Sequence, residues 1–189
     1  MMAVSDSLSD RVREMTNRIS ESGAPALSGL FDLTAHRLHR YAVTITRNQH
    51  DAEDVVQAVL VQVAGKPGLL SQADHPWHYL LQMVRNRAIL VTRNRKRTFS
   101  VTNLYDLITR RSVDEVDLEE THREVWTALR KLPSNQREVV VLKIWEELTF
   151  AQIASILELT PSTVASRYRY AMTKLSRHLQ ANRPEVPHE

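Results

Sequence analysis

Hydrophobic residues recur every three or four positions along most of the chain, which is the spacing of one face of an α-helix. The spacing is clearest in residues 52–63 and 77–91, and it is also present in residues 30–45. No run of four to eight residues alternates between apolar and polar side chains from one turn signal to the next, so we expect no strand. The pattern predicts an all-α protein.

The second half of the chain repeats this helical habit in shorter pieces. Val125, Leu129 and Leu132 step by three and four, and an apolar stretch covers residues 139–145. Two short helical patterns follow, at residues 150–157 and from residue 161 onwards. Each half has enough residues for a small core of three or four helices. We therefore expect two small helical domains.

Polar residues mark where several of these helices begin. Asp51 is a candidate N-cap for a helix with Glu53 and Asp54 in its first turn, where carboxylates favour the positive end of the helix dipole. The dipeptide His75-Pro76 predicts an extended break before the next helix, because the residue before proline avoids the helical conformation.

Residues 149–175 have the pattern of a helix-turn-helix. Thr149 and Gln152 have the spacing of a capping box, and Thr160-Pro161 places an N-cap directly before a proline at the first helical position. A turn is expected at residues 158–160, and a left-handed conformation at Glu158 would cost about 1 kcal/mol. The two short helices and the turn between them predict a DNA-binding motif.

The second of these helices has two distinct faces. Val164, Tyr168, Ala171 and Leu175 share an apolar face that can pack on the domain. The face suited to base edges and phosphates carries hydroxyls and cations: Ser162, Thr163, Ser166, Arg167, Tyr170 and Lys174. The alternative is an amphipathic helix with an ordinary polar side.

The net charge of +3 hides a strong segregation of charge along the chain. Residues 27–97 and residues 123–183 each carry +5, and the acidic linker at residues 98–122 between them carries −4. Residues 1–26 are an N-terminal extension that could form a short helix or stay disordered, and residues 184–189 form an acidic tail. Two basic domains joined by an acidic linker suit a bipartite polyanion binder, although two solvated surfaces would have the same pattern.

A basic run follows the aromatic pair Trp77 and Tyr79. Its six cations suit phosphate binding: Arg85, Arg87, Arg93, Arg95, Lys96 and Arg97. The two aromatic rings could stack on unstacked bases. Trp77 also continues the apolar stripe of its helix, so core packing is its alternative role and the one that the pattern favours.

The acidic cluster Asp51, Glu53 and Asp54, with Gln57 one turn further on, allows three interpretations. The negative charge suits a partner surface that carries arginine, and it also suits a helix start. Acid–base catalysis would need an apolar pocket that shifts a pKa, and the sequence predicts none.

Composition excludes several classes of enzyme and cofactor site. There is no cysteine, and the four glycines form no phosphate-binding loop, so thiol catalysis, cysteine-ligated zinc and nucleotide loops are excluded. The pairs His36/His39 and His75/His78 lack a nearby third ligand, so we expect no metal, no cofactor and no catalytic residue. The sequence has no apolar stretch of about 20 residues and no signal peptide, so we expect a cytoplasmic protein without membrane insertion.

Three strings resemble bacterial sigma factors. Residues 132–139 and 148–167, with Leu132-Pro133, Gln136-Arg137-Glu138-Val139 and Thr163-Val164 among them, look like region 4, which binds the −35 promoter element. Residues 51–57 (Asp-Ala-Glu-Asp-Val-Val-Gln) are similar to region 2, and residues 77–88 resemble its −10-facing helix. Two such blocks in this order resemble the extracytoplasmic-function subfamily.

The resemblance implies a non-catalytic specificity subunit of RNA polymerase that directs initiation at −10 and −35 elements. It implies that Asp51, Glu53, Asp54 and Gln57 bind the β′ coiled coil of core polymerase. The −10 DNA would meet the basic run, Lys66, Asn86 and the aromatic pair, and the loop at residues 64–76 would capture a flipped base. The resemblance also implies an anti-sigma factor as a further partner. The alternative is a helix-turn-helix regulator that binds a palindromic operator without polymerase.

Overall fold

The computed structural model describes residues 7–22, 24–66, 68–99 and 120–181, and these residues form helices and turns without a strand. The expected all-α architecture is confirmed. The chain divides into two compact units, residues 1–109 and 110–189. Most of the predicted acidic linker, residues 100–119, lies outside the described residues, and so does the tail at residues 184–189.

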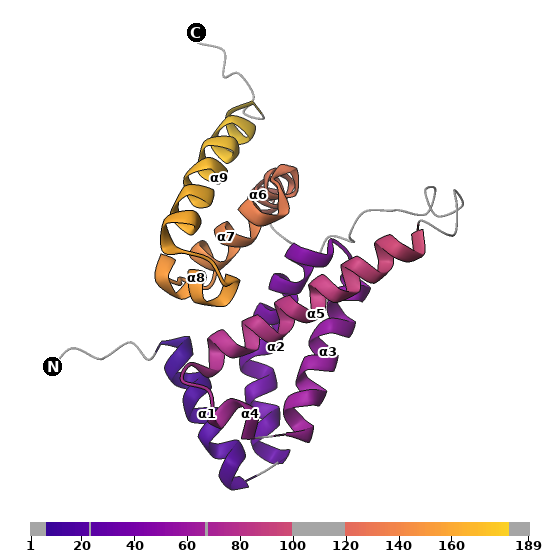
Figure 1. Ribbon diagram of the computed structural model, residues 1–189, viewed down its shortest axis with the longest axis vertical. Helices are drawn as coiled ribbons and strands as arrows, with labels where there is room; N and C mark the ends of the chain where they lie inside the picture. Colours follow the sequence, from indigo (N-terminus) through magenta and orange to yellow (C-terminus); the bar gives the residue numbers. More distant parts are fainter. Residues whose placement is uncertain (1–6, 23, 67, 100–119, 182–189) are drawn as a thin grey trace, which may run out of the picture. The chain divides into compact units, whose positions relative to one another are not determined.

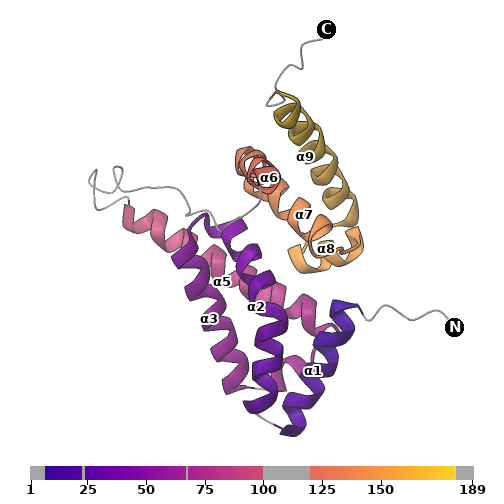
Figure 2. The ribbon, with the colours of Figure 1, turned by 180° about the vertical axis from the view of Figure 1, so that it is seen from behind.

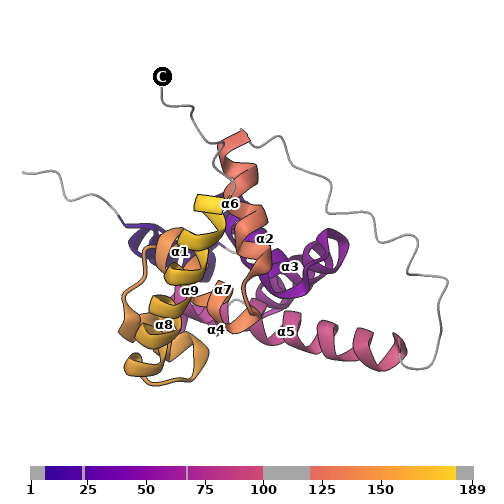
Figure 3. The same cartoon turned by 90° about the horizontal axis from the view of Figure 1, so that it is seen from above.

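The first unit contains five helices within its described residues. They are α1 (Leu8–Ser22), α2 (Ala24–Thr46), α3 (Gln49–Gly65), the short α4 (Gly68–Ser71) and α5 (Pro76–Phe99). Helix α2 lies between α1 and α3 (Figure 1), and the view from behind shows the same order (Figure 2). Helix α5 packs against the other four helices, and Figure 3 shows it from above as one long rod.

The stripes predicted from the hydrophobic pattern form the core of this unit. On α3 every predicted position is buried: Ala52, Val55, Val56, Val59, Leu60 and Val63. On α5 the predicted positions Trp77, Leu80, Leu81, Val84 and Ala88 are buried, and the last one, Val91, is half-buried. Leu30 and Phe31 both lie in the predicted stripe of residues 30–45 on α2. Leu30 is buried as the stripe predicts, whereas the prediction is wrong for Phe31, whose side chain is 50% exposed.

Helix α1 covers part of the N-terminal segment for which the sequence left a helix and a disordered extension open. It packs on α2, α4 and α5, and it buries Val12, Thr16 and Ile19. The Thr16 hydroxyl donates to the Val12 carbonyl oxygen at 2.8 Å, so this buried polar group has a partner. Residues 8–22 are therefore an integral part of the first unit.

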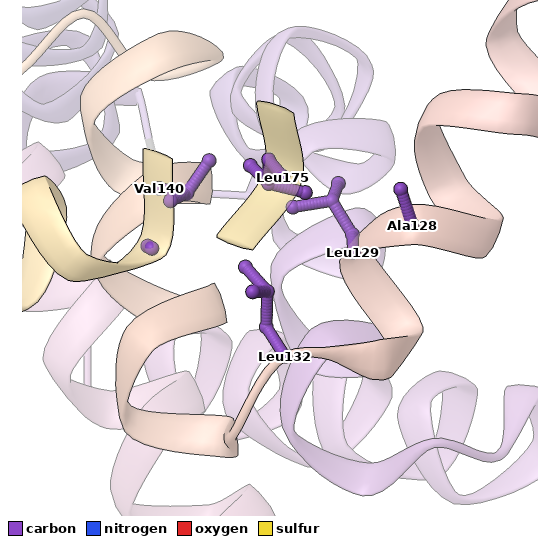
Figure 4. Close-up of a cluster of buried hydrophobic side chains, with 6 residues drawn as sticks. Ala128, Leu129, Leu132, Val140 and Leu175 are labelled. Atoms are coloured by element: carbon purple, nitrogen blue, oxygen red, sulfur yellow. The ribbon is translucent and has the colours of Figure 1, made fainter. Parts of the chain in front are cut away.

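The second unit contains α6 (Glu120–Lys131), α7 (Ser134–Ile144), α8 (Phe150–Leu157) and α9 (Pro161–Ala181). Helix α9 packs against the other three. Figure 4 shows the centre of the contact, where Ala128 and Leu129 of α6 and Val140 of α7 meet Leu175 of α9, with Leu132 beside them. The rings of Trp126 and Trp145 stack beside this cluster with centroids 5.4 Å apart.

One helix start differs from the expectation. The N-cap of α3 is Asn48 and not Asp51, because the Asn48 side-chain oxygen accepts from the Asp51 backbone N–H at 2.9 Å. Asn48 has the extended backbone that a cap requires, whereas Asp51 already lies in the first helical turn. Helix α5 begins at Pro76, directly after the expected break at His75.

Candidate nucleic-acid interface

Helices α8 and α9 form the predicted helix-turn-helix, and two side-chain caps and one backbone turn fix its geometry. The capping box at the start of α8 is complete, since Thr149 Oγ1 accepts from the Gln152 N–H at 3.3 Å and Gln152 Oε1 accepts from the Thr149 N–H at 2.8 Å. Helix α8 ends at Glu158, which has the left-handed conformation (φ 57°). Thr160 Oγ1 then caps α9 by accepting from the Thr163 N–H at 3.2 Å.

The two faces of α9 are those that the sequence predicted. Val164, Ala171 and Leu175 are buried in the unit. On the predicted DNA face Thr163, Ser166 and Arg167 are half-buried, whereas Ser162, Tyr170 and Lys174 are exposed. The face therefore has a polar surface that solvent, and a ligand, can reach.

The orientation of α9 is set by contacts from α7 and α8. Lys143 Nζ donates to the Leu148 carbonyl oxygen at 3.1 Å and lies 5.4 Å from the centre of the Phe150 ring. The Phe150 ring in turn contacts the Tyr168 ring, with centroids 5.5 Å apart. These contacts hold the loop before α8 and the start of α8 against α9, so the polar face of α9 is presented by a rigid support.

At the first turn of α9, Thr160 also organises two hydroxyls of the predicted DNA face. Its Oγ1 lies 3.0 Å from Ser162 Oγ and 2.8 Å from Thr163 Oγ1. A hydroxyl has one proton and two lone pairs, and the Thr163 N–H already occupies one lone pair of Thr160. The remaining capacity of Thr160 is one donor and one acceptor, so one of its two neighbours retains a proton for an external ligand.

In the first unit the acidic cluster at the start of α3 separates into different environments. Glu53, Asp54 and Gln57 are exposed. Asp51 is only partly exposed, and its Oδ2 accepts from Arg95 Nη1 of α5 at 2.9 Å. The structure thus pairs a predicted polymerase-binding residue with a predicted DNA-binding residue.

A hollow with a volume of about 810 Å³ lies between α2 and α3, next to this cluster. Its lining is mainly apolar and includes Phe31 and Val61, which are 50% and 64% exposed. Glu53 and Gln57 line it as well. Exposed apolar side chains in one contiguous patch, here beside the Glu53 carboxylate, are typical of a protein-binding surface.

The predicted basic run lies along α5. Arg87 and Arg93 are exposed, Asn86 is exposed, and Arg85 is half-buried. The backbone of Lys96 and Arg97 continues the helix, and their side chains lie outside the described ones. Trp77 is 1% exposed and belongs to the core, so its indole is not available for stacking on a base. Tyr79 is half-buried.

The segment between α3 and α5 contains the exposed Lys66 and the short helix α4. Leu70 is buried and anchors α4, and the Ala73 N–H donates to the Leu70 carbonyl oxygen at 3.1 Å. Residues 71, 72, 74 and 75 are exposed. The segment is therefore a surface loop held at one end by Leu70 and at the other by Trp77.

The histidine pairs do not assemble a metal site. Within the described ranges no group of three or more His, Asp or Glu side chains could hold a metal ion. The His75 and His78 rings are 4.9 Å apart. Burial lowers the pKa of His78 below 6.5, and the neighbouring His75 lowers it further. Among the helices that the structure describes, none is long and apolar enough to cross a membrane.

Besides the Asp51–Arg95 pair, two further contacts near these surfaces were not anticipated from the sequence. The Asn48 cap has a sequence signal, because Asn is a preferred N-cap residue and an acidic residue follows it in the first turn. The Arg13 side chain of α1 donates to the carbonyl oxygen of Asp74. No local pattern could have found this contact, since the two residues are 61 positions apart.

Comparison with known families matches both units. A model of sigma-70 region 2 matches residues 30–98, and a model of sigma-70 region 4 matches residues 122–175. Together the two models cover well over half of the chain.

The chain aligns with curated relatives over most of their length. The chain is 29% identical over 160 residues to the ECF RNA polymerase sigma factor SigL of Mycobacterium tuberculosis, which is 83% of this chain and 90% of the relative. It is 25% identical over 161 residues to the ECF RNA polymerase sigma factor SigK of a Mycobacterium species. The alignment covers 82% of this chain and 83% of the relative.

Solved structures show the same fold. The sigma factor RpoE of Bartonella quintana, in complex with the anti-sigma factor NepR, superposes with a TM-score of 0.68 at 20% identity and covers 82% of this chain and 98% of its own. CnrH in complex with the cytosolic domain of CnrY gives a TM-score of 0.62 at 21% identity, with coverage of 92% and 100%.

Proposed function

The chain belongs to the extracytoplasmic-function subfamily of sigma-70 factors, and from this premise we propose which of its surfaces perform each part of promoter recognition. As a sigma factor, it binds core RNA polymerase and directs promoter-specific initiation. The observation that carries this conclusion is the presence of regions 2 and 4, in that order, on one chain. We propose that it supplies recognition and no catalysis of its own, and that it acts in the cytoplasm with polymerase and DNA.

In this proposal the start of α3 docks on the β′ coiled coil of core polymerase. Glu53, Asp54 and Gln57 are exposed and supply charge and hydrogen bonds, and Asp51 contributes while it is paired with Arg95. The apolar hollow next to them offers Phe31 and Val61 to the same partner. An anti-sigma factor, as NepR is for RpoE, would compete for this unit.

The −10 element would contact α5 and the loop before it. Arg85, Asn86, Arg87, Arg93 and Tyr79 lie along α5, with Arg95, Lys96 and Arg97 towards its end, and Lys66 begins the loop. Cations in such a row neutralise phosphates without reading sequence. The exposed loop is the part suited to contact a base. Trp77 is left out of this set because it is buried.

The −35 element would be read by the polar face of α9, with Ser162, Thr163, Ser166 and Arg167 nearest to the N-terminus and Tyr170 and Lys174 further along. A helix that enters the major groove with its N-terminal residues can contact base edges directly. Among the N-terminal residues of this set, Arg167 can bond a guanine bidentately through its guanidinium.

One reconstitution tests the assignment. Adding the protein to sigma-free core polymerase should give transcripts that start at one position of a responsive promoter. The Arg167→Ala variant should lose about 1–3 kcal/mol of −35 discrimination, and Arg130→Ala, which removes the same charge from α6, should lose none. Asp54→Arg should abolish co-purification with core polymerase while helicity stays intact.

The alternative, a regulator that binds an operator alone, gives a different outcome. It predicts sequence-specific DNA binding as a dimer without polymerase, and no transcript in the reconstitution. Normal co-purification of Asp54→Arg would remove the docking assignment alone, and unchanged −35 preference in Arg167→Ala would remove the role of Arg167.

A further inference from the structure

Helix α1 contacts the exposed loop before α5. This helix precedes residue 30, where the match to region 2 begins. It packs against α4, which lies within the loop, and against α5, which follows the loop. Burial of Val12 and Thr16 fixes one face of α1 in the core, and Arg13 follows Val12 directly. Arg13 is thus carried on a rigid element at the edge of the loop.

The loop needs such a contact because its middle extends into solvent. Its internal backbone hydrogen bonds reach Ala73, whose N–H donates to Leu70, and the Tyr79 N–H donates to the His75 carbonyl oxygen inside the start of α5. Asp74 lies between these two bonded parts, and its carbonyl oxygen accepts from the Arg13 guanidinium. The Arg13 contact therefore ties α1 to the point of the loop where its own bonds leave a gap.

We propose that Arg13 is a positioning residue for −10 recognition, because it holds residues 71–75 in the conformation that meets the DNA. This inference rests on the proposed function of the loop. Arg13 itself touches no base in this scheme. A guanidinium suits the role, since its several donors lie in a fixed fork and its charge strengthens a hydrogen bond to a carbonyl oxygen.

The test uses holoenzyme reconstituted from core polymerase and the full chain. A promoter library randomised over the −10 element, and a second one randomised over the −35 element, are selected by transcription with each variant. The variants are Arg13→Ala, Arg13→Lys and the matched control Arg18→Ala. Arg18 lies on the same helix and pairs with Glu14 at 2.7 Å, away from the loop contact. Gln72→Ala tests the loop itself.

We expect Arg13→Ala to reduce the −10 sequence preference about three- to tenfold, the range typical of residues that act through another group. Its −35 preference, its affinity for core polymerase and its thermal midpoint should match those of Arg18→Ala. Arg13→Lys should recover part of the preference, because it keeps one charged donor. Amide hydrogen exchange at residues 71–75 should be faster in Arg13→Ala than in Arg18→Ala.

Two results would overturn the inference. The first is a −10 preference in Arg13→Ala equal to that of Arg18→Ala while Gln72→Ala weakens it. The second is an equal loss of −10 preference, −35 preference and polymerase affinity, which would indicate general loosening of the unit. If Gln72→Ala and Arg13→Ala both leave the −10 preference unchanged, the loop does not read the −10 element, and it is the proposed function of the loop that fails.

Discussion

Glu158 has a backbone conformation that most side chains avoid. Its φ of 57° and ψ of 48° place it in the left-handed region, where the Cβ atom approaches the following carbonyl oxygen. The residue ends α8, and its conformation sets the angle at which α9 leaves the turn. The strain at this residue therefore lowers the stability of the second unit, and the turn of the helix-turn-helix requires it.

Replacing Glu158 by glycine should raise the free energy of unfolding of the second unit by about 0.5–1 kcal/mol, because glycine adopts this conformation without a Cβ clash. Chemical denaturation of the full protein measures the change. Glu158→Ala is the control, since it removes the charge but keeps Cβ, and it should give no gain. An equal gain in both variants would show that the charge, and not the backbone, is responsible.

His78 is one residue through which pH acts on the stability of the first unit. Burial, and then the neighbouring His75, keep the folded-state pKa of His78 below the ordinary histidine value of 6.5. As the pH falls, His78 is therefore protonated less in the folded protein than in the unfolded chain. Stability is fully present above about pH 6.5 and is lost as the pH drops from there towards the folded-state pKa. The slope cannot exceed about 1.4 kcal/mol per pH unit for one proton.

Unfolding curves measured between pH 7.5 and 5 should therefore show that the free energy of unfolding falls with decreasing pH. This fall should be smaller in His78→Gln than in the natural protein. His36→Gln, which changes an exposed histidine of α2, is the matched control and should keep the natural slope. The idea is wrong if His78→Gln and His36→Gln decline in parallel.

At the scale of elements, the Asp51–Arg95 pair joins the start of α3 to the far part of α5. Their side chains are 27% and 37% exposed, and the N–O distance is 2.9 Å. A partly exposed pair of this kind adds little to stability. Its consequence is electrostatic, because a carboxylate beside Arg95 reduces the attraction of that arginine for phosphate.

Asp51→Asn should therefore strengthen DNA binding by the free protein and steepen the dependence of log K on log salt by about 0.9, the effect of one more phosphate contact. Salt titrations of fluorescence anisotropy measure this slope. Asp54→Asn removes the same charge three residues further along α3. It should change the slope less, because the ion pair with Arg95 is made by Asp51. Equal slopes in the two variants would mean that only net charge matters.

The hydrophobic pattern predicted most elements because it records which face of each helix is buried. The stripes on α3, α5 and α9 follow it, and the caps Thr149 and Thr160 were readable because each bonds to a residue three positions away. Local pattern could not show pairings between helices. Arg95 bonds a residue 44 positions away, so the sequence assigned it and Asp51 to two different partners.

Phe31 shows a second limit of the hydrophobic pattern, which does not separate buried positions from exposed ones. Its position in a helical stripe predicts burial, but Leu30 fills the core position and Phe31 faces the hollow between α2 and α3. A stripe wide enough to include both residues cannot distinguish a core contact from a partner-binding surface. That distinction depends on which neighbouring helix is present.

At the scale of the whole molecule, the two units are joined by the chain between Phe99 and Glu120. About 20 residues can span at most roughly 70 Å, so promoter sites one to two DNA turns apart, at about 34 Å per turn, are within covalent reach. Joining two weak contacts in one chain raises the effective concentration of the second and can strengthen the whole by about 10²–10⁴.

Cutting the chain at a protease site placed within residues 100–119 should weaken promoter binding by holoenzyme about a hundredfold or more, with most of the loss in the dependence on the −35 element. The same site placed in residues 184–189 and cut there is the control, and it should leave binding unchanged. Undiminished −35 dependence after the internal cut would show that polymerase alone holds the second unit in place.

The placement of the tryptophans gives each unit its own optical reporter. Trp77 is buried in the first unit, whereas Trp126 and Trp145 stack with an interplanar angle of 27° in the second. These are all three tryptophans of the chain. In a Trp77→Phe variant the indole fluorescence would come from the second unit alone, and the stacked pair should give it an exciton couplet in circular dichroism. Unfolding of the two units could then be followed separately without attaching a dye.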